Sequence, residues 1–381
     1  MGVSIIEHFM ELPDPRGARG KRHPLTVILT IAIMAVICGN DDFEGMEEFG
    51  NSKRVWLSGF LELPHGIPSV DTFRRVFAAL DPQAFERCFM SWMKGLVGSL
   101  EGKLIAIDGK TLRRSFERAW APHSAVHMVS AFVQANAVVF AQVAVEDKSN
   151  EITAIPKLLE LLDIHGATVS IDAMGCQKAI AQKIKEGGGE YVLALKGNQG
   201  VLHDKTVALL DEAIRQDFKG MIFDHYRETD AGHGRIEERT LWITPEIEHL
   251  GESIQGFEGL AGVAVVEARR EVAGKEPGAG NQTGVERRYY LFSHQEMTAR
   301  RIADFVRGHW SVENQLHWTL DVQFNEDQSR VREGYAAENL SRVRRIALNL
   351  LKQEKTCKKG IAIKRLKAGW DTAYLLKVLQ M

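Results

Sequence analysis

Across residues 103–214, short β-rich runs alternate with segments of helical periodicity. Three strand-like runs come first, a helix follows, and strands then alternate with helices, which indicates an α/β fold with a mixed sheet. The 381 residues are 45% hydrophobic, enough to bury a large core. Strands are predicted at residues 103–109, 126–135, 137–145, 167–173 and 191–196, and helices at residues 152–162, 178–185 and 201–214.

Segments of different character flank this α/β part. The sequence predicts helices before it, a β-rich stretch after it, and helices again towards the end. The later strands are predicted at residues 238–243, 262–267 and 287–292, with a surface turn at 274–284 and helices at 300–320 and 335–352. The expected regions are a helical N-terminal region (1–100), the first part of the core (101–216), a β-rich insertion (217–297) and basic C-terminal helices that complete the core (298–381).

The N-terminal region combines a basic loop at residues 14–23 with short helices joined by a Gly/Pro turn. Helices are expected at residues 25–38 and 43–57, and Ser69 is expected to cap a third helix that carries Arg74 and Arg75. This order is typical of a helix-turn-helix-like DNA-binding unit. A small helical bundle with ordinary surface arginines fits the same pattern.

Composition excludes several classes of protein. The four cysteines lie far apart without a Cys-x-x-Cys pair, so neither a zinc-cysteine module nor a disulfide framework is indicated. The longest apolar run, residues 25–38, is too short to span a bilayer, which needs roughly 20 residues. We therefore expect no membrane partner and a cytoplasmic, nucleoid-associated protein. The net charge of −2 neither favours nor opposes nucleic acid.

Two aspartates lie at the ends of predicted central strands: Asp108 and Asp172. A carboxylate in this position is poorly solvated, so it needs a cation, a lysine or a helix N-terminus nearby. Ligands usually bind at the carboxyl ends of strands in α/β sheets. One such acid is most often structural, but two on neighbouring strands favour a metal site.

A third acid, Glu313, lies in a predicted helix dense in His and Trp. His309, Glu313 and His317 are spaced four residues apart, so they are expected to share one helix face. This face could bind a metal directly, or Glu313 could be the ligand while the histidines orient phosphate. A polar face packed against the insertion is the structural alternative.

Three carboxylates suffice for phosphodiester chemistry with two divalent ions. A pair of magnesium ions roughly 3.5–4 Å apart activates the nucleophile and stabilises the leaving oxygen. Magnesium prefers oxygen ligands and keeps several waters, and manganese can substitute for it. We assign Asp108 as the ligand that bridges both ions, with Asp172 and Glu313 each holding one.

Residues 330–367 contain twelve Lys or Arg against three acids, a local excess in a nearly neutral chain. Arg342, Arg344 and Arg345 lie on one predicted helix, and further lysines follow it. Such a tract favours contact with the phosphate backbone, and we select Arg342 and Arg345 as DNA-binding residues. A solvated helix face is the alternative.

Several ordered motifs resemble the H-repeat-associated branch of bacterial insertion-sequence transposases. The resemblance runs from the basic N-terminal loop nearly to the C-terminus, which makes it far more specific than the spacing of three acids. The motifs are IAIDGKTLRR at residues 105–114, NEITAIP at 150–156, SIDAMGCQ at 170–177, ALKGNQ at 194–199, GHGRIEER at 232–239, HWSVEN at 309–314, LDV at 320–322 and NED at 325–327.

The resemblance implies a ribonuclease H-like mixed sheet with flanking helices, interrupted by a β-rich insertion before the last catalytic acid. It also implies a DDE transposase that depends on magnesium and acts on double-stranded DNA with terminal inverted repeats. Carried onto this chain, the catalytic acids are Asp108, Asp172 and Glu313. Transposases of this kind act in assemblies that bring two DNA ends together on target DNA, so we expect at least a homodimer in a synaptic complex.

The chain departs from related transposases around the last acid. A Tyr and an Arg often precede that acid and a Lys follows it, but Val306, His309 and Thr319 or its neighbours occupy those places here. The candidates for gripping transposon-end phosphates are Lys110, Arg307 and His309. Trp310 or Trp318 could stack on a flipped base during hairpin processing, although helix packing is the favoured explanation for each. In the insertion, Arg235 and Arg239 are further candidates for DNA contact, and His233 is either functional or a solvated loop residue.

Two other functions are consistent with the same residues. A metal-dependent nuclease would cut DNA with the same ions but would not join it. A catalytically inactive relic would still bind DNA, although all three acids are present here. The sequence therefore predicts a DNA transposase that cleaves and transfers strands at insertion-sequence ends.

Overall fold

The computed structural model describes residues 5–17, 21–116, 125–145, 150–232, 235–272 and 282–380. The chain forms two compact units, and each is assembled from segments that are separated in the sequence. Unit 1 comprises Met1–Ser99, Gly109–Asn150 and Val312–Met381. Unit 2 comprises Leu100–Asp108 and Glu151–Ser311.

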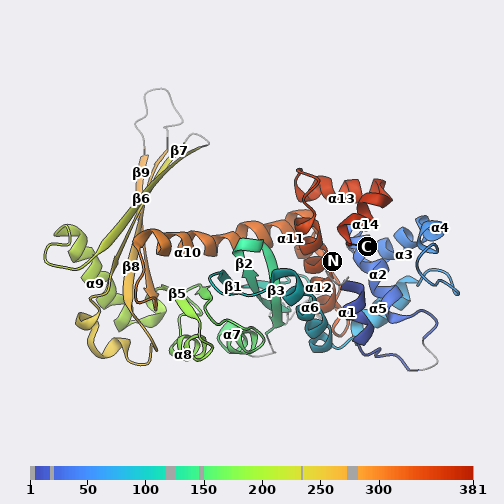
Figure 1. Cartoon of the computed structure of the whole chain (residues 1–381), viewed down its shortest axis with the longest axis horizontal. Coiled ribbons are helices and arrows are strands. Elements are labelled where there is room, and N and C mark those ends of the chain that lie inside the picture. The colour runs from blue at the N-terminus through green and yellow to red at the C-terminus, as the bar shows by residue number, and fades with distance from the viewer. Residues whose placement is uncertain are drawn as a thin grey trace. The chain divides into compact units, whose positions relative to one another are not determined.

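Unit 1 is mainly helical (Figure 1). The apolar run folds as α2 (Leu25–Ile37), which is buried on nearly every side, as a helix without a polar face must be. The helix α12 (Ala336–Gln353) packs against α2 and α5 (Val70–Ala79). Further helical elements of this unit include α1 (Ile5–His8), η1 (Phe9–Glu11), α3 (Phe43–Ser52), α4 (Arg54–Leu57), α6 (Pro82–Val97), α11 (Trp318–Gln323), η8 (Glu326–Gln328), α13 (Ile361–Trp370) and α14 (Thr372–Val378).

Local capping explains where the N-terminal helices begin. The hydroxyl of Ser69 accepts a hydrogen bond from the amide of Thr72, which confirms the predicted N-cap of α5. Asp42 caps α3 in the same way. The single helix predicted at residues 43–57 is instead two helices, because the backbone at Lys53 leaves the helical conformation. Part of the predicted basic loop, residues 18–20, lies outside the described residues.

The predicted hairpin of unit 1 is confirmed. The strand β2 (His127–Val133) pairs antiparallel with β3 (Val138–Ala144), and a short turn, η4 (Gln134–Asn136), connects them. Ala137 takes a left-handed conformation (φ 53°) that reverses the chain. Behind β3, the side-chain amide of buried Asn349 on α12 hydrogen-bonds both backbone groups of Val139.

The nine strands form one mixed sheet in the order β3-β2-β1-β4-β5-β9-β8-β7-β6. The strands β1 (Leu104–Thr111), β4 (Thr168–Ile171) and β5 (Glu190–Leu195) are parallel, and β9 (Gln282–Phe292) pairs antiparallel with β5. This arrangement confirms the expected α/β fold with a ribonuclease H-like mixed sheet. The insertion continues the sheet through β9 instead of forming a separate one.

Helices of unit 2 cover both faces of its central strands. The helices α7 (Glu151–Glu160) and α8 (Lys178–Glu186) lie on one face and α10 (Ala299–Val312) on the other (Figure 1). On the α10 side, Ile302 and Val306 pack into a buried apolar cluster with Leu104 and Val192 of the sheet. These layers fix the ends of β1 and β4, where the predicted acids lie.

The insertion is a long antiparallel ribbon of four strands. Its strands are β6 (Asp224–Gly232), β7 (Arg235–Thr244), β8 (Gly262–Val272) and β9. Sequence analysis predicted only the inner parts of β7, β8 and β9 and missed β6. The outer parts lack alternating apolar residues and pair Arg with Glu instead, as between Arg270 and Glu237 at 3.2 Å. Most of the predicted turn at 274–284 lies outside the described residues, and its last residues belong to β9.

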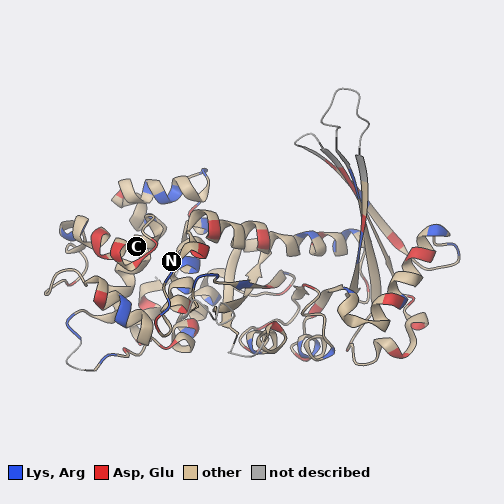
Figure 2. Cartoon of the chain, turned by 180° about the vertical axis from the view of Figure 1, so that it is seen from behind, with Lys and Arg blue, Asp and Glu red and all other residues tan. Residues whose placement is uncertain are grey.

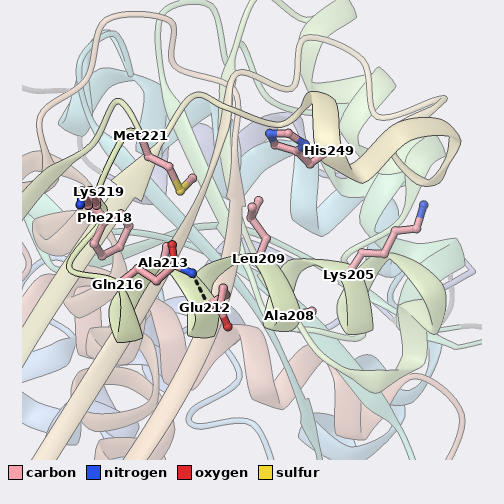
Figure 3. Close-up of a pocket in the computed structure, with 10 residues that line it drawn as sticks. All are labelled: Lys205, Ala208, Leu209, Glu212, Ala213, Gln216, Phe218, Lys219, Met221 and His249. Atoms are coloured by element: carbon pink, nitrogen blue, oxygen red, sulfur yellow. Dashed lines mark hydrogen bonds between the residues drawn. The ribbon is translucent and has the colours of Figure 1, made fainter.

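The helix α9 (Val201–Arg215) packs beside the ribbon and lines a hollow of about 450 Å³. Leu209, Phe218 and Met221 form its apolar wall, and Lys205 and His249 lie at its edge (Figure 3). Neither Asp108 nor Asp172 lines this hollow. Within the described part of the chain, no helix combines the length and the apolar character needed to cross a membrane.

Candidate active site

Asp108 and Asp172 lie next to each other on neighbouring parallel strands of unit 2. The pairing of β1 with β4 runs from Leu104 opposite Thr168 to Ile107 opposite Ile171, and an aspartate follows each of the last two residues. Both aspartates are half-buried. Asp172 ends its strand as predicted, whereas Asp108 lies within β1, because β1 has a second neighbour in the sheet and continues to Thr111.

The loop after β4 fixes the carboxylate of Asp172. Its Oδ1 accepts hydrogen bonds from the amides of Met174 at 3.0 Å and Gly175 at 3.3 Å. A side chain at position 175 would not fit, because a Cβ there would lie 2.2 Å from Cγ2 of Ile171. The second oxygen, Oδ2, accepts no hydrogen bond from the described residues, so it is available to a ligand.

Two amide side chains from the turn that follows β5 hold this loop in place. Asn198 donates to the carbonyl of Ala173 at 2.7 Å, and Gln199 donates to that of Cys176 at 2.6 Å. Sequence analysis quoted this stretch only as a motif and gave neither residue a role. The available signal was their position directly after a predicted strand, where ligand-binding loops gather.

His309 contacts the strand that leads to Asp172. Its Nδ1 lies 3.0 Å from Oγ of Ser170, whose side chain is on the same face of the strand as Asp172. Burial lowers the pKa of His309, and the charge of Asp172 only partly offsets this effect. The ring is therefore neutral at neutral pH, and the contact of His309 with transposon-end phosphates stays a prediction. Its contact with Ser170 is the role that the structure shows.

Glu313 begins a π-helical turn, η7 (Glu313–His317), in unit 1. Its side chain is exposed, whereas Leu316 in the same turn is buried and anchors it. The wider turn breaks the α-helical spacing, and His317 is half-buried among charged groups while Glu313 faces solvent. The prediction that His309, Glu313 and His317 share one helix face is therefore wrong. Such π-turns are frequent at functional sites.

His317 makes the stability of unit 1 sensitive to acid. Burial lowers its pKa to about 3, and the positive charges of Arg345 and Lys110 add to the effect. Because the unfolded ring takes up a proton near pH 6.5, stability is complete above that pH and is lost progressively towards pH 3. At pH 5 the expected loss relative to pH 7 is about 2 kcal/mol.

Urea unfolding at pH 7 and pH 5 tests this expectation. The variant His317→Gln, which cannot titrate, should lose about 2 kcal/mol less than the wild type between these pH values. Equal losses in the two proteins would show that His317 does not carry the acid sensitivity.

The predicted DNA contacts of Arg342 and Arg345 are contradicted by their burial. Arg342 is 2% exposed and pairs with Glu86 at 2.8 Å, and Arg345 is fully buried and pairs with Glu326 at 2.9 Å. Arg344 is buried as well and donates to the carbonyl of Asp41. Basic and acidic residues are interspersed along the helices of this unit (Figure 2). The exposed basic residues of the tract are Arg330, Lys355, Lys358 and Lys359.

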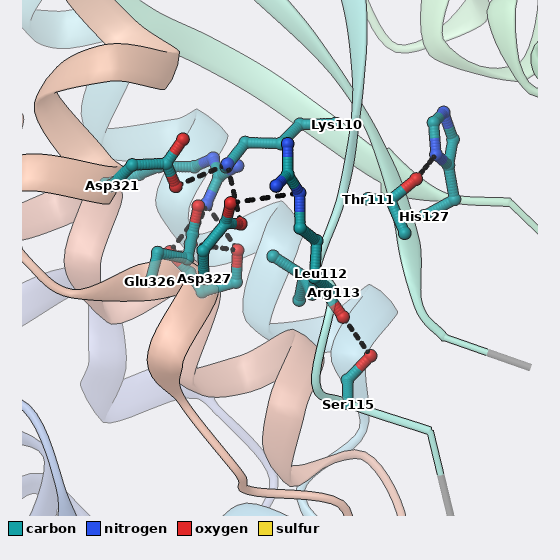
Figure 4. A network of polar contacts seen from close by, with 11 residues as sticks. Lys110, Thr111, Leu112, Arg113, Ser115, His127, Asp321, Glu326 and Asp327 are labelled. Carbon is teal, nitrogen blue, oxygen red and sulfur yellow. Dashed lines mark hydrogen bonds and ion pairs between the residues drawn. The ribbon is translucent and has the colours of Figure 1, made fainter. Parts of the chain in front are cut away.

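Lys110 is also buried in ion pairs. Its ammonium lies 2.5 Å from Asp321 and 3.1 Å from Asp327, and 8% of the side chain is exposed (Figure 4). Burial raises the pKa of Asp321, and the charge of Lys110 opposes that rise. The predicted phosphate contact of Lys110 is therefore contradicted, since it would require both ion pairs to break.

Three further candidates for DNA contact belong to unit 2. Arg307 on α10 is about half exposed, with its guanidinium 2.5 Å from Glu228 of the ribbon. Arg239 pairs with Glu237 at 2.8 Å. Arg235 begins β7, but its side chain and the residue His233 lie outside the described part of the structure.

The donor groups at the paired aspartates suit a hard divalent cation. Asp108 and Asp172 offer carboxylate oxygens, and Ser170 adds a hydroxyl nearby. Magnesium and manganese favour such oxygen ligands, with waters and substrate oxygens completing the shell. Among the described residues, no cluster of three or more His, Cys, Asp or Glu side chains is arranged to hold a metal ion.

Similarity to known proteins extends over nearly the whole chain. Residues 6–93 match the family described as DDE_Tnp_1-associated, and residues 100–350 match the Transposase DDE domain. "Putative transposase YncI" of Escherichia coli O157:H7 is 40% identical over 379 residues, covering 99% of this chain and 94% of that protein. "H repeat-associated putative transposase YhhI" of Escherichia coli K12 is 38% identical, covering 98% and 97%. A cryo-EM structure of a piggyBac transposase synaptic complex with hairpin DNA aligns with 98% of this chain and 76% of its own, at 8% identity and a TM-score of 0.42.

Proposed function

The chain belongs to the H-repeat-associated branch of the DDE transposases, and on this basis we propose that it cleaves DNA at insertion-sequence ends and transfers the strands to target DNA. The observation that carries the proposal is the adjacency of Asp108 and Asp172 on paired parallel strands. Family membership indicates the class of reaction, and the paired acids are the residues that we propose bind its metal ions.

We propose that Asp108, Asp172 and Glu313 hold two magnesium ions, which manganese can replace. Asp108 would bridge the ions, and Asp172 and Glu313 would each hold one. When bound, such ions activate an attacking water or 3′-hydroxyl and stabilise the leaving oxygen. The pair Asp108 and Asp172 is supported by strand register, and Glu313 by its motif and its exposed position on the π-turn.

Neighbouring residues of unit 2 keep the carboxylate of Asp172 ready for this role. The amides of Met174 and Gly175 hold one oxygen, so the other has a fixed direction. Ser170, with neutral His309 against it, holds the strand just before the acid. Such support lowers the cost of ordering a ligand when the ion binds.

The proposed substrate is double-stranded DNA, first the inverted repeats at the transposon ends and then the target. Exposed lysines after α12 and exposed arginines elsewhere offer phosphate contacts that are weakened by salt. We propose that a homodimer brings two ends together in a synaptic complex and that it works in the cytoplasm on nucleoid DNA. The proposed contacts are Arg74, Arg75, Arg235, Arg307, Lys355, Lys358 and Lys359.

A nicking assay tests this function. Purified protein and its Asp108→Asn variant are incubated with a labelled duplex ending in the flanking repeats, with magnesium or with EDTA. Nicking at the repeat end that needs magnesium and disappears in the variant supports the proposal. Tight binding without any nicking would contradict it and would favour a DNA-binding relic.

A further inference from the structure

Lys110 joins two segments of unit 1 that are 211 positions apart in the chain. One segment is the end of β1, and the other contains α11 and the turn η8, which carry Asp321 and Asp327 (Figure 4). Both acids reach the same ammonium, at 2.5 and 3.1 Å. A single buried cation therefore ties a strand to the segment that follows Glu313.

The position of Lys110 in β1 connects it to the proposed chemistry. Asp108 and Lys110 are two residues apart in one strand, so their side chains project from the same face. On the other side of the ion pairs, α11 directly continues the π-turn that begins at Glu313. The ion pairs thus act on the strand of one proposed metal ligand and on the helix of another.

The burial of Lys110 makes this link stronger than an ordinary surface ion pair. Exposed pairs contribute little to stability, whereas breaking a buried pair leaves an uncompensated charge and is strongly destabilising. Arg113 provides a direct comparison in the same cluster. It also lies 3.1 Å from Asp327, but its side chain is 77% exposed, so its contribution is small.

We propose that Lys110 is a positioning residue. Together with Asp321 and Asp327 it fixes the strand segment after Asp108 to the helix that follows Glu313, and thereby sets how tightly the acids bind divalent ions. This inference rests on the proposed function of those acids. The motif IDGK at residues 107–110 therefore contains the proposed ligand Asp108 and, two residues later, Lys110, which holds the strand of that ligand in place.

Binding of Mn²⁺ to the full chain, measured by electron paramagnetic resonance, tests the proposal without relying on cleavage. Lys110→Met and Asp321→Asn should each weaken Mn²⁺ binding by about 10- to 100-fold, the usual effect of losing a residue that supports a metal ligand. Arg113→Met is the matched control and should bind as the wild type does. For Lys110→Met the direction is diagnostic, because removing a buried positive charge without any positioning effect would strengthen cation binding, whereas the exposed charge of Arg113 is screened by the solvent.

The outcomes separate this inference from the function on which it rests. If Asp108→Asn abolishes Mn²⁺ binding while Lys110→Met and Asp321→Asn bind normally, the positioning role is overturned and the metal site stands. If Asp108→Asn itself binds Mn²⁺ like the wild type, the proposed function fails. Thermal unfolding identifies a variant that does not fold. The double variant Lys110→Met/Asp321→Asn, which leaves the net charge unchanged, then decides: it should bind Mn²⁺ more weakly than the wild type if Lys110 positions the acids, and binding as tight as in the wild type overturns the inference.

Discussion

Replacing Asp172 with Asn is expected to reduce nicking at the repeat ends by roughly 10³-fold or more. The amide has nearly the shape of the carboxylate, and its oxygen can still accept from the amides of Met174 and Gly175, so the loop should keep its form. What is lost is the negative charge that a divalent ion requires. Thermal unfolding should therefore be unchanged while the initial rate of nicking collapses.

The matched control is Asp163→Asn, which removes an exposed aspartate of the same unit. That variant should nick DNA at the wild-type rate. If Asp172→Asn also retained most of the nicking activity, Asp172 would not be a metal ligand. The adjacency of Asp108 and Asp172 would then contribute only to the structure of the sheet.

Breaking the ion pair between Arg345 and Glu326 is expected to be the most destabilising single change in unit 1. Both side chains are fully buried, 2.9 Å apart, and Ser341 donates a further hydrogen bond to Glu326. Arg345→Met would leave the carboxylate buried without its main cation, at a cost of about 3–5 kcal/mol. The unfolding temperature should fall by on the order of 10 °C.

Two further variants test the reason for this loss. The double variant Arg345→Met/Glu326→Met removes both charges and should recover much of the stability, since apolar replacement of a whole buried pair is often neutral. Arg74→Met breaks an exposed pair with Asp71 and should hardly change the unfolding temperature. A double variant no more stable than Arg345→Met would show that packing, rather than the uncompensated charge, causes the loss.

The sequence was sufficient for the parts of the fold that periodicity determines. The predicted alternation of strands and helices agrees with the structure from β1 to α9. The two aspartates could be placed next to each other because parallel strands align their carboxyl ends. The outer part of the ribbon was harder to predict, since its strands are stabilised by cross-strand pairs of Arg and Glu and lack an alternating apolar face.

The basic tract was misinterpreted because a count along the chain takes no account of distant partners. Glu86, which pairs with Arg342, is 256 positions away, and the backbone oxygen of Asp41 that receives Arg344 is 303 positions away. Lys110 was misassigned for the same reason. The π-turn at Glu313 could not be predicted either, because it depends on how Leu316 packs and leaves no signal in the spacing of polar residues.

The most direct test of the central claim is a strand-joining assay. The protein is given a pre-cleaved repeat end with a free 3′-hydroxyl, a supercoiled target plasmid and magnesium, and the joined strand is measured on a denaturing gel. A transposase with the proposed site gives joined product that is absent with EDTA and absent for Asp108→Asn. Binding of the end without joined product, under conditions in which the wild type nicks DNA, would contradict transposition and would leave a nuclease that cuts without joining.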